Sequence, residues 1–181
     1  MSTIDELKTE IRKNIRNIKA EVPFEEKLER SAILFEQVEK LSVFMDADSV
    51  MLFWSMSDEV QTPDFILKWY LKKRIILPSV DGSNLRLKVF TGINSMKSGE
   101  SFGIPEPDGE DFLFPDRIGL IIVPGVAFDR NNNRMGRGKA YYDKLLKNLD
   151  AYKLGVCFNF QLLENVPVDE FDIKMDQVLV C

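Results

Sequence analysis

The chain of 181 residues contains no histidine. This absence excludes catalytic pairs in which an imidazole activates a serine or a cysteine, and metal sites with an imidazole ligand. A bound metal ion would have to be a hard cation held by carboxylates, and Mg²⁺ is the best candidate.

Cysteine is scarce too, with Cys157 and Cys181 as the only two. Their spacing does not suggest a metal cluster, and two cysteines cannot form a disulfide framework, so a reducing cytosol is expected. Long apolar runs are also missing, and the first residues, MSTIDELKTEIRKN, lack the apolar core of a signal peptide. We therefore expect a cytoplasmic protein that does not bind membranes.

Basic residues are fewer than acidic residues: the chain has 24 Lys and Arg and 29 Asp and Glu, which gives a formal net charge of −5. This balance argues against nucleic-acid binding, although a local basic pocket is compatible with it. A hydrophobic fraction of 45% is typical of globular proteins. Because no repeat, low-complexity tract or break in pattern occurs, one domain over residues 1–181 is expected.

Apolar residues spaced three and four apart predict helices near the start of the chain. One stripe consists of Ile4, Leu7, Ile11, Ile15 and Ile18, and a second, after Pro23, of Leu28, Ala32, Phe35, Val38 and Leu41. A third helix is predicted over 62–73, where Thr62 and Pro63 suit the N-cap and the first helical position. A fourth is expected over 138–149.

Short apolar segments between these helices predict strands. They are SVMLFW (49–54), RIILP (74–78), LRLKVF (85–90), IGLIIVPG (118–125), YKLGVCF (152–158) and residues 177–180. The segment 91–117 is rich in Gly, Pro, Ser and acidic residues and is expected to be an irregular connection. Strands that alternate with helices and are apolar on both faces indicate an α/β fold with a largely parallel sheet.

The stretch RMGRGKAYYD (134–143) comes after the most apolar strand, at the end of the loop 126–137 and the start of the helix expected over 138–149. It combines glycines that allow close backbone approach with cations that attract an anion, namely Gly136, Gly138, Arg134, Arg137 and Lys139. Ligands of open α/β sheets bind beyond the carboxyl ends of strands, where this loop is expected. The stretch therefore predicts an anion site, with a glycine-rich turn that carries a solvated basic face as the alternative.

Two common phosphate-binding motifs are excluded. A Walker A loop would need glycine at Asn133 and Ser or Thr at Ala140, and a dinucleotide fingerprint would need glycine at Tyr141.

The longer segment VPGVAFDRNNNRMGRGKAYYDKLL (123–146) resembles the signature of the 5-formyltetrahydrofolate cyclo-ligase family, also called methenyltetrahydrofolate synthetases. Four further blocks resemble the family in the same order: ELKTEIRKNI (6–15), WSMSDEVQT (54–62), GIPEP (103–107) and VPVDEFDIKMDQVL (166–179). The resemblance implies a three-layer α/β/α fold and ATP- and Mg²⁺-dependent conversion of 5-formyltetrahydrofolate to 5,10-methenyltetrahydrofolate. The implied partners are small molecules only, and a monomer is expected.

The resemblance also assigns roles to residues of this chain. It implies ATP binding by Lys8, Arg12, Arg134, Gly136, Arg137, Gly138, Lys139 and Tyr142, and folate binding by Trp54, Glu59, Arg137, Lys139 and Tyr141. It implies Mg²⁺ binding by Asp143 and Asp172. Lys139 and Arg137 are the residues expected to stabilise charge in phosphoryl transfer, a reaction that needs positioning and neutralisation more than a base.

Simpler interpretations of these residues stay open at this point. Lys8 and Arg12 lie at i, i+4 on one helix face and could be solvated charges, Glu59 a surface acid, Trp54 a core aromatic and Asp143 a first-turn helix acid. The chain also departs from the family pattern at Asn132, Ala140 and Phe171. The alternatives to an active enzyme are a folate- or nucleotide-binding homologue without turnover and a noncatalytic interaction domain.

Overall fold

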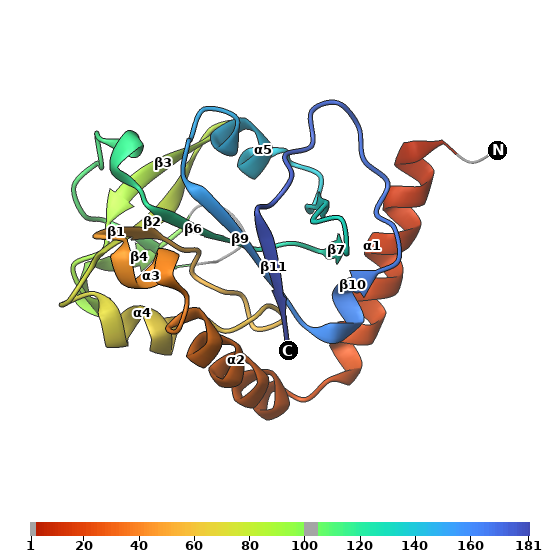
Figure 1. Ribbon diagram of the computed structural model, residues 1–181, viewed down its shortest axis with the longest axis horizontal. Helices are drawn as coiled ribbons and strands as arrows, with labels where there is room; N and C mark the ends of the chain where they lie inside the picture. Colours follow the sequence, from red (N-terminus) through yellow and green to blue (C-terminus); the bar gives the residue numbers. More distant parts are fainter. Residues whose placement is uncertain (1–2, 100–104) are drawn as a thin grey trace.

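The computed structural model describes residues 3–99 and 105–181. Its main sheet has six strands in the order β11-β9-β6-β1-β2-β3 (Figure 1). Their bounds are β1 Ser49–Met51, β2 Arg74–Asp81, β3 Asn84–Val89, β6 Leu120–Val123, β9 Tyr152–Cys157 and β11 Gln177–Val180. All neighbouring strands are parallel except β2 and β3, which form an antiparallel hairpin. The prediction of a largely parallel sheet is confirmed.

Helices cover both faces of this sheet, so the predicted three-layer α/β/α fold is confirmed. On one face, α2 (Phe24–Val38), α3 (Ser42–Asp46) and α4 (Pro63–Trp69) pack over Val50 and Ile75. On the other, α5 (Tyr141–Leu146) packs over their sequence neighbours Met51 and Ile76. Because helices cover both faces of the sheet, both faces are buried. This burial explains why the strands are apolar on both faces.

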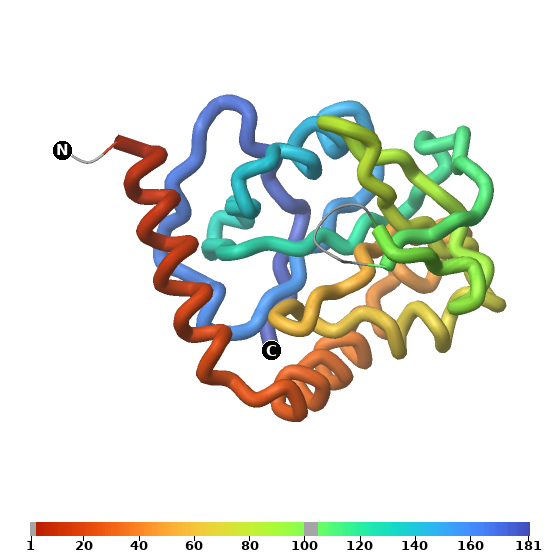
Figure 2. Tube along the Cα trace, turned by 180° about the vertical axis from the view of Figure 1, so that it is seen from behind, coloured from red at the N-terminus to blue at the C-terminus, as the bar shows by residue number. Residues whose placement is uncertain are grey.

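Helix α1 (Ile4–Glu21) lies beside the sheet rather than on it, as both the front and the rear views show (Figures 1 and 2). A capping box begins the helix, in which the Thr3 hydroxyl accepts from Glu6 N and the Glu6 carboxylate accepts from Thr3 N. Within the predicted stripe Ile15 is buried, while Ile4 and Ile18 are 46% and 39% exposed. Only part of this apolar stripe is buried, because α1 packs against a small sheet instead of the main core.

This small sheet contains β10, β7 and β8, in that order. Strands β7 (Ala127–Asp129) and β8 (Arg134–Met135) form an antiparallel hairpin, and β10 (Leu162–Leu163) pairs with β7. The prediction that 126–137 is a loop is therefore wrong. Strands of two or three residues are too short to leave a period in the sequence.

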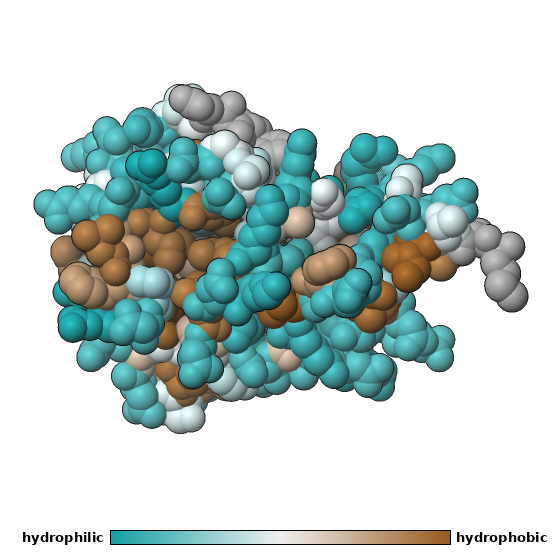
Figure 3. Space-filling model, turned by 90° about the horizontal axis from the view of Figure 1, so that it is seen from above, coloured by the Kyte–Doolittle hydropathy of each residue, from teal (hydrophilic) through white to brown (hydrophobic). Residues whose placement is uncertain are grey.

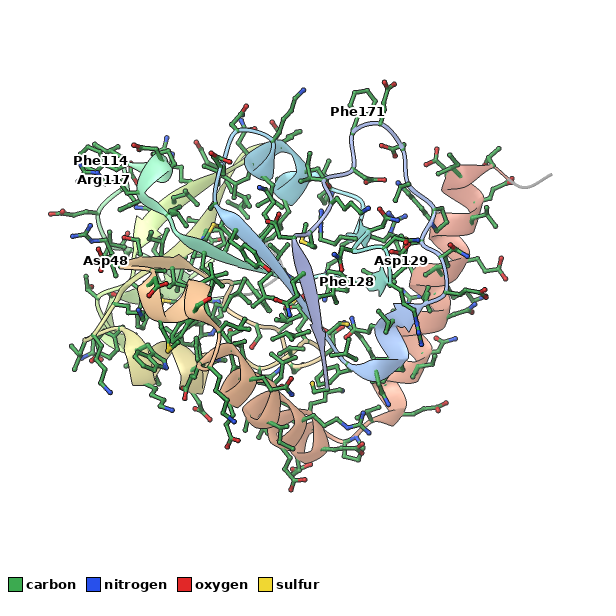
Figure 4. All side chains as sticks on the ribbon, in the orientation of Figure 1. Asp48, Phe114, Arg117, Phe128, Asp129 and Phe171 are labelled. Atoms are coloured by element: carbon green, nitrogen blue, oxygen red, sulfur yellow. The ribbon has the colours of Figure 1, made fainter. Side chains whose placement is uncertain are left out.

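Asp129 ends β7 and holds the hairpin together (Figure 4). Its buried carboxylate accepts hydrogen bonds from Asn131 N, Asn133 N and Asn133 Nδ2 at 2.9–3.0 Å, and from Val166 N at 3.0 Å. Asn132 adopts a left-handed φ of 64°, as its side chain tolerates. This turn determines where β8 begins, at Arg134. The hydrogen bond from Val166 N attaches the C-terminal segment to the turn.

The segment 91–117 is mostly irregular, as predicted, but it contains a two-stranded sheet of β4 (Met96–Ser98) and β5 (Pro105–Pro107). Single turns of 3₁₀ helix occur at Ile93–Ser95 and Pro115–Arg117, and a third follows β9 at Asn159–Gln161. Residues 103–104 of the GIPEP block lie outside the described residues.

Several predicted boundaries need correction. The strand expected over 49–54 ends at Met51, and the helix expected over 62–73 is α4, Pro63–Trp69. The hydroxyl of Thr62 does not cap α4, because it accepts from Ser55 N at 3.1 Å and donates to Phe53 O at 2.6 Å instead. No helix in the described part of the chain is long and apolar enough to cross a membrane.

The helix expected over 138–149 is shortened to α5, Tyr141–Leu146. Gly138 and Ala140 have φ of 99° and 54°, outside the right-handed helical region, so the helix cannot begin before Tyr141. Gly138 and Lys139 therefore belong to a loop, and helical backbone amides contribute less to an anion site than the sequence suggested.

Candidate active site

A cleft of about 670 Å³ opens beyond the carboxyl ends of β1 and β6, where an open α/β sheet binds ligands. All thirteen residues singled out from the sequence line it: Lys8, Arg12, Trp54, Glu59, Arg134, Gly136, Arg137, Gly138, Lys139, Tyr141, Tyr142, Asp143 and Asp172. They come from α1, the loop after β1, β8, the loop 136–140, α5 and the C-terminal segment. Folding thus joins residues that are up to 164 positions apart.

One part of the cleft wall is apolar and suits a flat aromatic ligand. Its side chains include Phe53, Trp54, Met56, Pro78, Val80 and Leu85. Trp54 lines the cleft and also packs on the core, with its ring 5.9 Å from that of Phe90. Phe171 adds a 71% exposed ring at the tip of the C-terminal loop (Figure 4).

Hydrophilic residues dominate the face of the molecule that Figure 3 shows, and hydrophobic residues are most visible in the half away from the N-terminus.

Glu59 stands in an ion cluster at the edge of this apolar wall. One carboxylate oxygen lies 3.0 Å from the Arg137 guanidinium, and the other accepts from Met56 N at 3.0 Å. Arg137 also contacts Asp58 at 3.1 Å, and Asp58 contacts buried Lys19 at 3.4 Å. Burial would raise the pKa of Asp58, but the charges of Lys19 and Arg137 outweigh it and lower that pKa. Glu59 is therefore oriented, not a loose surface acid.

Lys8 joins α1 to the C-terminal segment. Its ammonium lies 2.6 Å from Asp172 and 2.8 Å from Asp169, and the side chain is only 8% exposed. Burial would lower the pKa of Lys8, but the hydrogen bonds to both carboxylates raise it above its ordinary value. The interpretation of Lys8 as a solvated helix charge is wrong.

Buried Arg134 forms an ion pair at 2.7 Å with the partly buried Asp143 in the cleft. The guanidinium lies over the Tyr142 ring at 5.7 Å and donates to Pro124 O at 3.3 Å. Two atoms of this group, Arg134 Nε and Tyr142 Oη, are buried without a hydrogen-bond partner in the described part of the chain. Buried donors without partners are costly in a protein interior, which marks this wall as the side of a binding site.

Burial, reinforced by the charge of Glu59, raises the pKa of the Tyr142 phenol well above its ordinary value. Tyr142 therefore stays protonated at neutral pH and offers its O–H as a donor.

The glycines of the loop 136–140 let guanidinium groups lie against the backbone. Arg12 Nε donates to Gly136 O at 3.0 Å. A Cβ at Gly136 would lie 3.0 Å from the Arg134 guanidinium, and one at Gly138 would lie 3.5 Å from that of Arg12. Lys139 differs from these paired cations, because it is exposed and has no hydrogen bond or ion pair with any residue in 3–99 or 105–181.

The two carboxylates implied as metal ligands come together at Ile173. Asp143 Oδ1 accepts from Ile173 N at 3.3 Å and from Arg134, and Asp172 immediately precedes Ile173. Asp172 uses Oδ2 for its bonds to Lys8 and Asp169 N. Each carboxylate thus keeps one oxygen that no described residue occupies. No three Asp, Glu or Cys residues in the described ranges form a metal cage. The two unoccupied carboxylate oxygens are hard donors of the kind that Mg²⁺ takes together with substrate oxygens and water.

Sequence reasoning missed the partners of these residues. Asp58 and Asp169 hold Arg137 and Lys8, and Glu106, also in the cleft, is buried and accepts from Ser79 Oγ at 2.5 Å. Asp58 lies next to Glu59, and Asp169 lies three positions before Asp172, both within the matched blocks. This closeness to an acidic residue of the expected site is the sequence signal that could have identified them.

Ala140 provides a first test of the loop geometry. Its left-handed backbone strains an L-residue with a Cβ, so Ala140→Gly should raise the free energy of unfolding by about 1 kcal/mol. In a protein of this size that corresponds to a rise in melting temperature of roughly 2–4 °C. Thermal unfolding by circular dichroism measures it, with Ala20→Gly in helix α1 as a control that should lower the melting temperature. An unchanged or lower melting temperature for Ala140→Gly would contradict the strained conformation.

Comparison with known proteins gives one consistent result. The model of the 5-formyltetrahydrofolate cyclo-ligase family matches residues 4–181. The mouse 5-formyltetrahydrofolate cyclo-ligase is 30% identical, over 96% of this chain and 91% of the mouse protein. The Escherichia coli K12 protein of the same name is 32% identical, over 74% and 78% of the two chains. The NMR structure of Aquifex aeolicus 5,10-methenyltetrahydrofolate synthetase has a TM-score of 0.86 and 34% identity, over 96% and 89%.

Proposed function

The chain belongs to the 5-formyltetrahydrofolate cyclo-ligase family, and we propose that its cleft converts 5-formyltetrahydrofolate to 5,10-methenyltetrahydrofolate with ATP and Mg²⁺. The observation that carries the proposal is the convergence of all thirteen expected residues on one cleft. The relatives' names describe enzymes, which favours turnover over the alternative of a noncatalytic binding homologue.

The cationic side of the cleft suits the phosphates of ATP. Arg12 and Arg134 are held by backbone carbonyl groups and by Asp143, so their charges are already positioned when a ligand enters. Preorganised charges of this kind stabilise a transferring phosphoryl group without reorganisation. Arg134 Nε and Tyr142 Oη, which have no partner among the described residues, are donors that ATP oxygens would satisfy. Mg²⁺ held by Asp143 and Asp172 would neutralise charge on the phosphates.

The apolar side suits the pterin ring of the folate. Trp54, Met56 and Tyr141 supply flat or adaptable contact surface, and Glu59 supplies carboxylate oxygens for the N–H groups of the pterin's amino-pyrimidine edge. Arg137 orients Glu59 through its 3.0 Å contact. We therefore assign Arg137 to the folate side and to fixing Glu59, with a smaller direct role in charge stabilisation than Lys139.

The reaction follows from placing these two ligands together. The formyl oxygen attacks the γ-phosphorus of ATP, the bond to ADP breaks, and the formyl carbon becomes electrophilic. N10 then bonds to that carbon and releases its proton, the C–O bond breaks, and phosphate leaves. Lys139 has no partner among the residues that the structure describes, so it can meet the charge that grows on the transferring group, whereas the other cations that the proposal uses are engaged by carboxylates or carbonyls.

Product formation tests the proposal. Mixing the protein with 5-formyltetrahydrofolate and Mg-ATP should produce the near-ultraviolet absorbance of the methenyl product, in proportion to enzyme concentration. Omission of ATP is the control. Absence of an ATP-dependent band at high protein concentration would refute the proposal and leave the two noncatalytic alternatives.

Glu59→Gln should raise the KM for the folate and spare ATP binding. The substitution turns one oxygen acceptor into an amide donor that faces donors on the pterin, and it removes the charge that holds Arg137. A loss of about tenfold to a hundredfold in folate affinity is expected from a charged hydrogen-bonding group worth 1.5–3 kcal/mol. Steady-state kinetics gives both KM values. An equal loss of ATP and folate affinity would instead point to a structural role.

The remaining expectations from the sequence stay predictions. They are the single domain over 1–181, the monomeric state, the cytoplasmic location and the absence of nucleic-acid or membrane partners.

A further inference from the structure

Glu106 belongs to the GIPEP block, to which the proposed function assigns no role. It lies in β5 and lines the cleft, yet only 8% of the residue is exposed. Its Oε2 accepts from Ser79 Oγ at 2.5 Å, and its Oε1 has no partner among residues 3–99 and 105–181. One oxygen of this carboxylate is therefore left for a ligand of the cleft.

Glu106 forms no ion pair with any residue that the structure describes. Lys97 stands opposite Glu106 in the ladder of β4 and β5, but it pairs with Asp108 at 2.7 Å. The other acidic residues of the described chain that line the cleft are exposed or paired with a cation, namely Asp5, Glu59, Asp143, Asp169, Glu170 and Asp172. Because a buried carboxylate without a cation costs stability, a function of the site has to explain Glu106.

The hydrogen bond to Ser79 fixes Glu106 at the apolar wall of the cleft. Ser79 lies in β2 between Pro78 and Val80, which both belong to that wall. Strand β5 reads Pro-Glu-Pro, and prolines restrict the backbone on both sides of Glu106. The carboxylate is thus held with little freedom on the side of the cleft that the proposed function gives to the folate.

The second step of the proposed reaction has to dispose of a proton. Phosphoryl transfer depends on positioning more than on a base, but N10 carries a hydrogen that must leave when N10 bonds to the formyl carbon. The chain has no histidine to accept it. Tyr142 stays protonated, because burial raises the pKa of its phenol. A carboxylate without a cationic partner is the kind of group that can accept this proton.

We propose that Glu106 is the general base of ring closure and takes the N10 proton at Oε1. This inference rests on the proposed function. N10 is joined to the pterin through a single CH₂ group, so it stays close to the wall that binds the pterin. N10 uses its lone pair to bond to the formyl carbon. Its proton passes to Oε1 and leaves an electron pair on N10, and the C–O bond breaks with its pair on phosphate. Glu106 returns the proton to water after the product leaves.

Single-turnover kinetics with the protein in excess over 5-formyltetrahydrofolate separates the two steps. Quenched samples give ADP, which reports phosphorylation, and the absorbance gives the methenyl product. Glu106→Gln keeps an oxygen that can accept from Ser79 but cannot take a proton. The variant should form ADP at a near-normal rate and methenyl product about 10²-fold more slowly, at the low end of what a general base contributes.

Three further variants complete the test. Glu106→Asp sets the carboxylate one CH₂ back and should show the same separation with a smaller loss, so the test stands even if Glu106→Gln does not fold. Ser79→Ala keeps the base and removes only its hydrogen bond, so product formation should slow by less than about tenfold. Glu110→Gln changes an exposed acid outside the cleft, four positions along the chain, and should leave both steps unchanged.

Three results would overturn the inference, and each is recognisable. Equal slowing of ADP and product formation in Glu106→Gln would make Glu106 a positioning residue for the folate. Normal rates of both steps would leave it as a structural tie between β5 and β2. If the unaltered protein formed neither ADP nor methenyl product, the proposed function itself would be refuted. Melting temperatures of all variants identify any loss that is due to unfolding.

Discussion

Lys139→Met should lower kcat by about 10²-fold or more, the effect of losing one preorganised electrostatic contact to a transition state. Lys139 lies in the loop 136–140, exposed at the cleft, without a partner among the described residues. Methionine keeps much of the stem and removes the charge. The affinity for ATP should fall less, because Arg12, Arg134 and Lys8 remain.

The absorbance assay gives kcat, and calorimetry gives nucleotide affinity on the same variant. Lys174→Met is the matched control, since Lys174 is exposed and lies outside the cleft. If Lys139→Met keeps a near-normal kcat, Lys139 is only a solvated charge, and the stabilising role passes to Arg137.

Asp129→Asn should lower the free energy of unfolding by about 3 kcal/mol or more, because it leaves buried donors without acceptors. Asp129 Oδ2 accepts from Asn133 Nδ2 and Val166 N, and Oδ1 accepts from two further backbone amides. An amide at this position brings N–H groups against N–H groups whichever way it is turned. Chemical denaturation measures the loss, and Asp116→Asn, at an exposed site, should change stability by about 0.5 kcal/mol or less.

Lowering the pH should reproduce part of the loss of stability expected for Asp129→Asn. Burial would raise the pKa of Asp129, but the hydrogen bonds from Asn133, Val166 and Asn131 lower it below its ordinary value. A carboxylate with a depressed pKa contributes stability that is fully present above its unfolded pKa of about 3.9 and is lost as the pH falls through the folded pKa. Asp129→Asn should therefore show a weaker loss of stability in acid than the unaltered protein. An equal acid dependence in both would contradict the role of this carboxylate.

Much of the fold could be predicted because its signals are local. Strands such as 120–123 and 152–157 are apolar on both faces, and α1 and α2 show a regular helical period. The hairpin of β7 and β8 could not be predicted, because its strands are too short to produce an alternating hydrophobic pattern in the sequence. The start of α5 depends on the backbone angles of Gly138 and Ala140, which sequence spacing does not reveal.

The residues of the candidate site could be predicted as well, but their pairing could not. Family blocks point to Lys8 and Asp172 separately, and only the folded chain brings them to 2.6 Å. Arg137 was expected to bind both phosphate and folate, and its ion pairs with Glu59 and Asp58 appear only in the structure. Contacts between distant segments depend on how α1, the loop after β1 and the C-terminal segment meet, which no local pattern encodes.

The fate of the formyl oxygen tests the central claim most directly. If the cleft phosphorylates that oxygen, 5-formyltetrahydrofolate labelled with ¹⁸O in the formyl group must yield inorganic phosphate that carries one ¹⁸O, because the P–O bond forms and the C–O bond breaks. Mass spectrometry of the phosphate after one turnover in unlabelled water measures this transfer. Phosphate that carries ¹⁸O in step with methenyl product is the predicted result. Methenyl product accompanied by unlabelled phosphate would contradict the mechanism, since the formyl oxygen would then have left by another route.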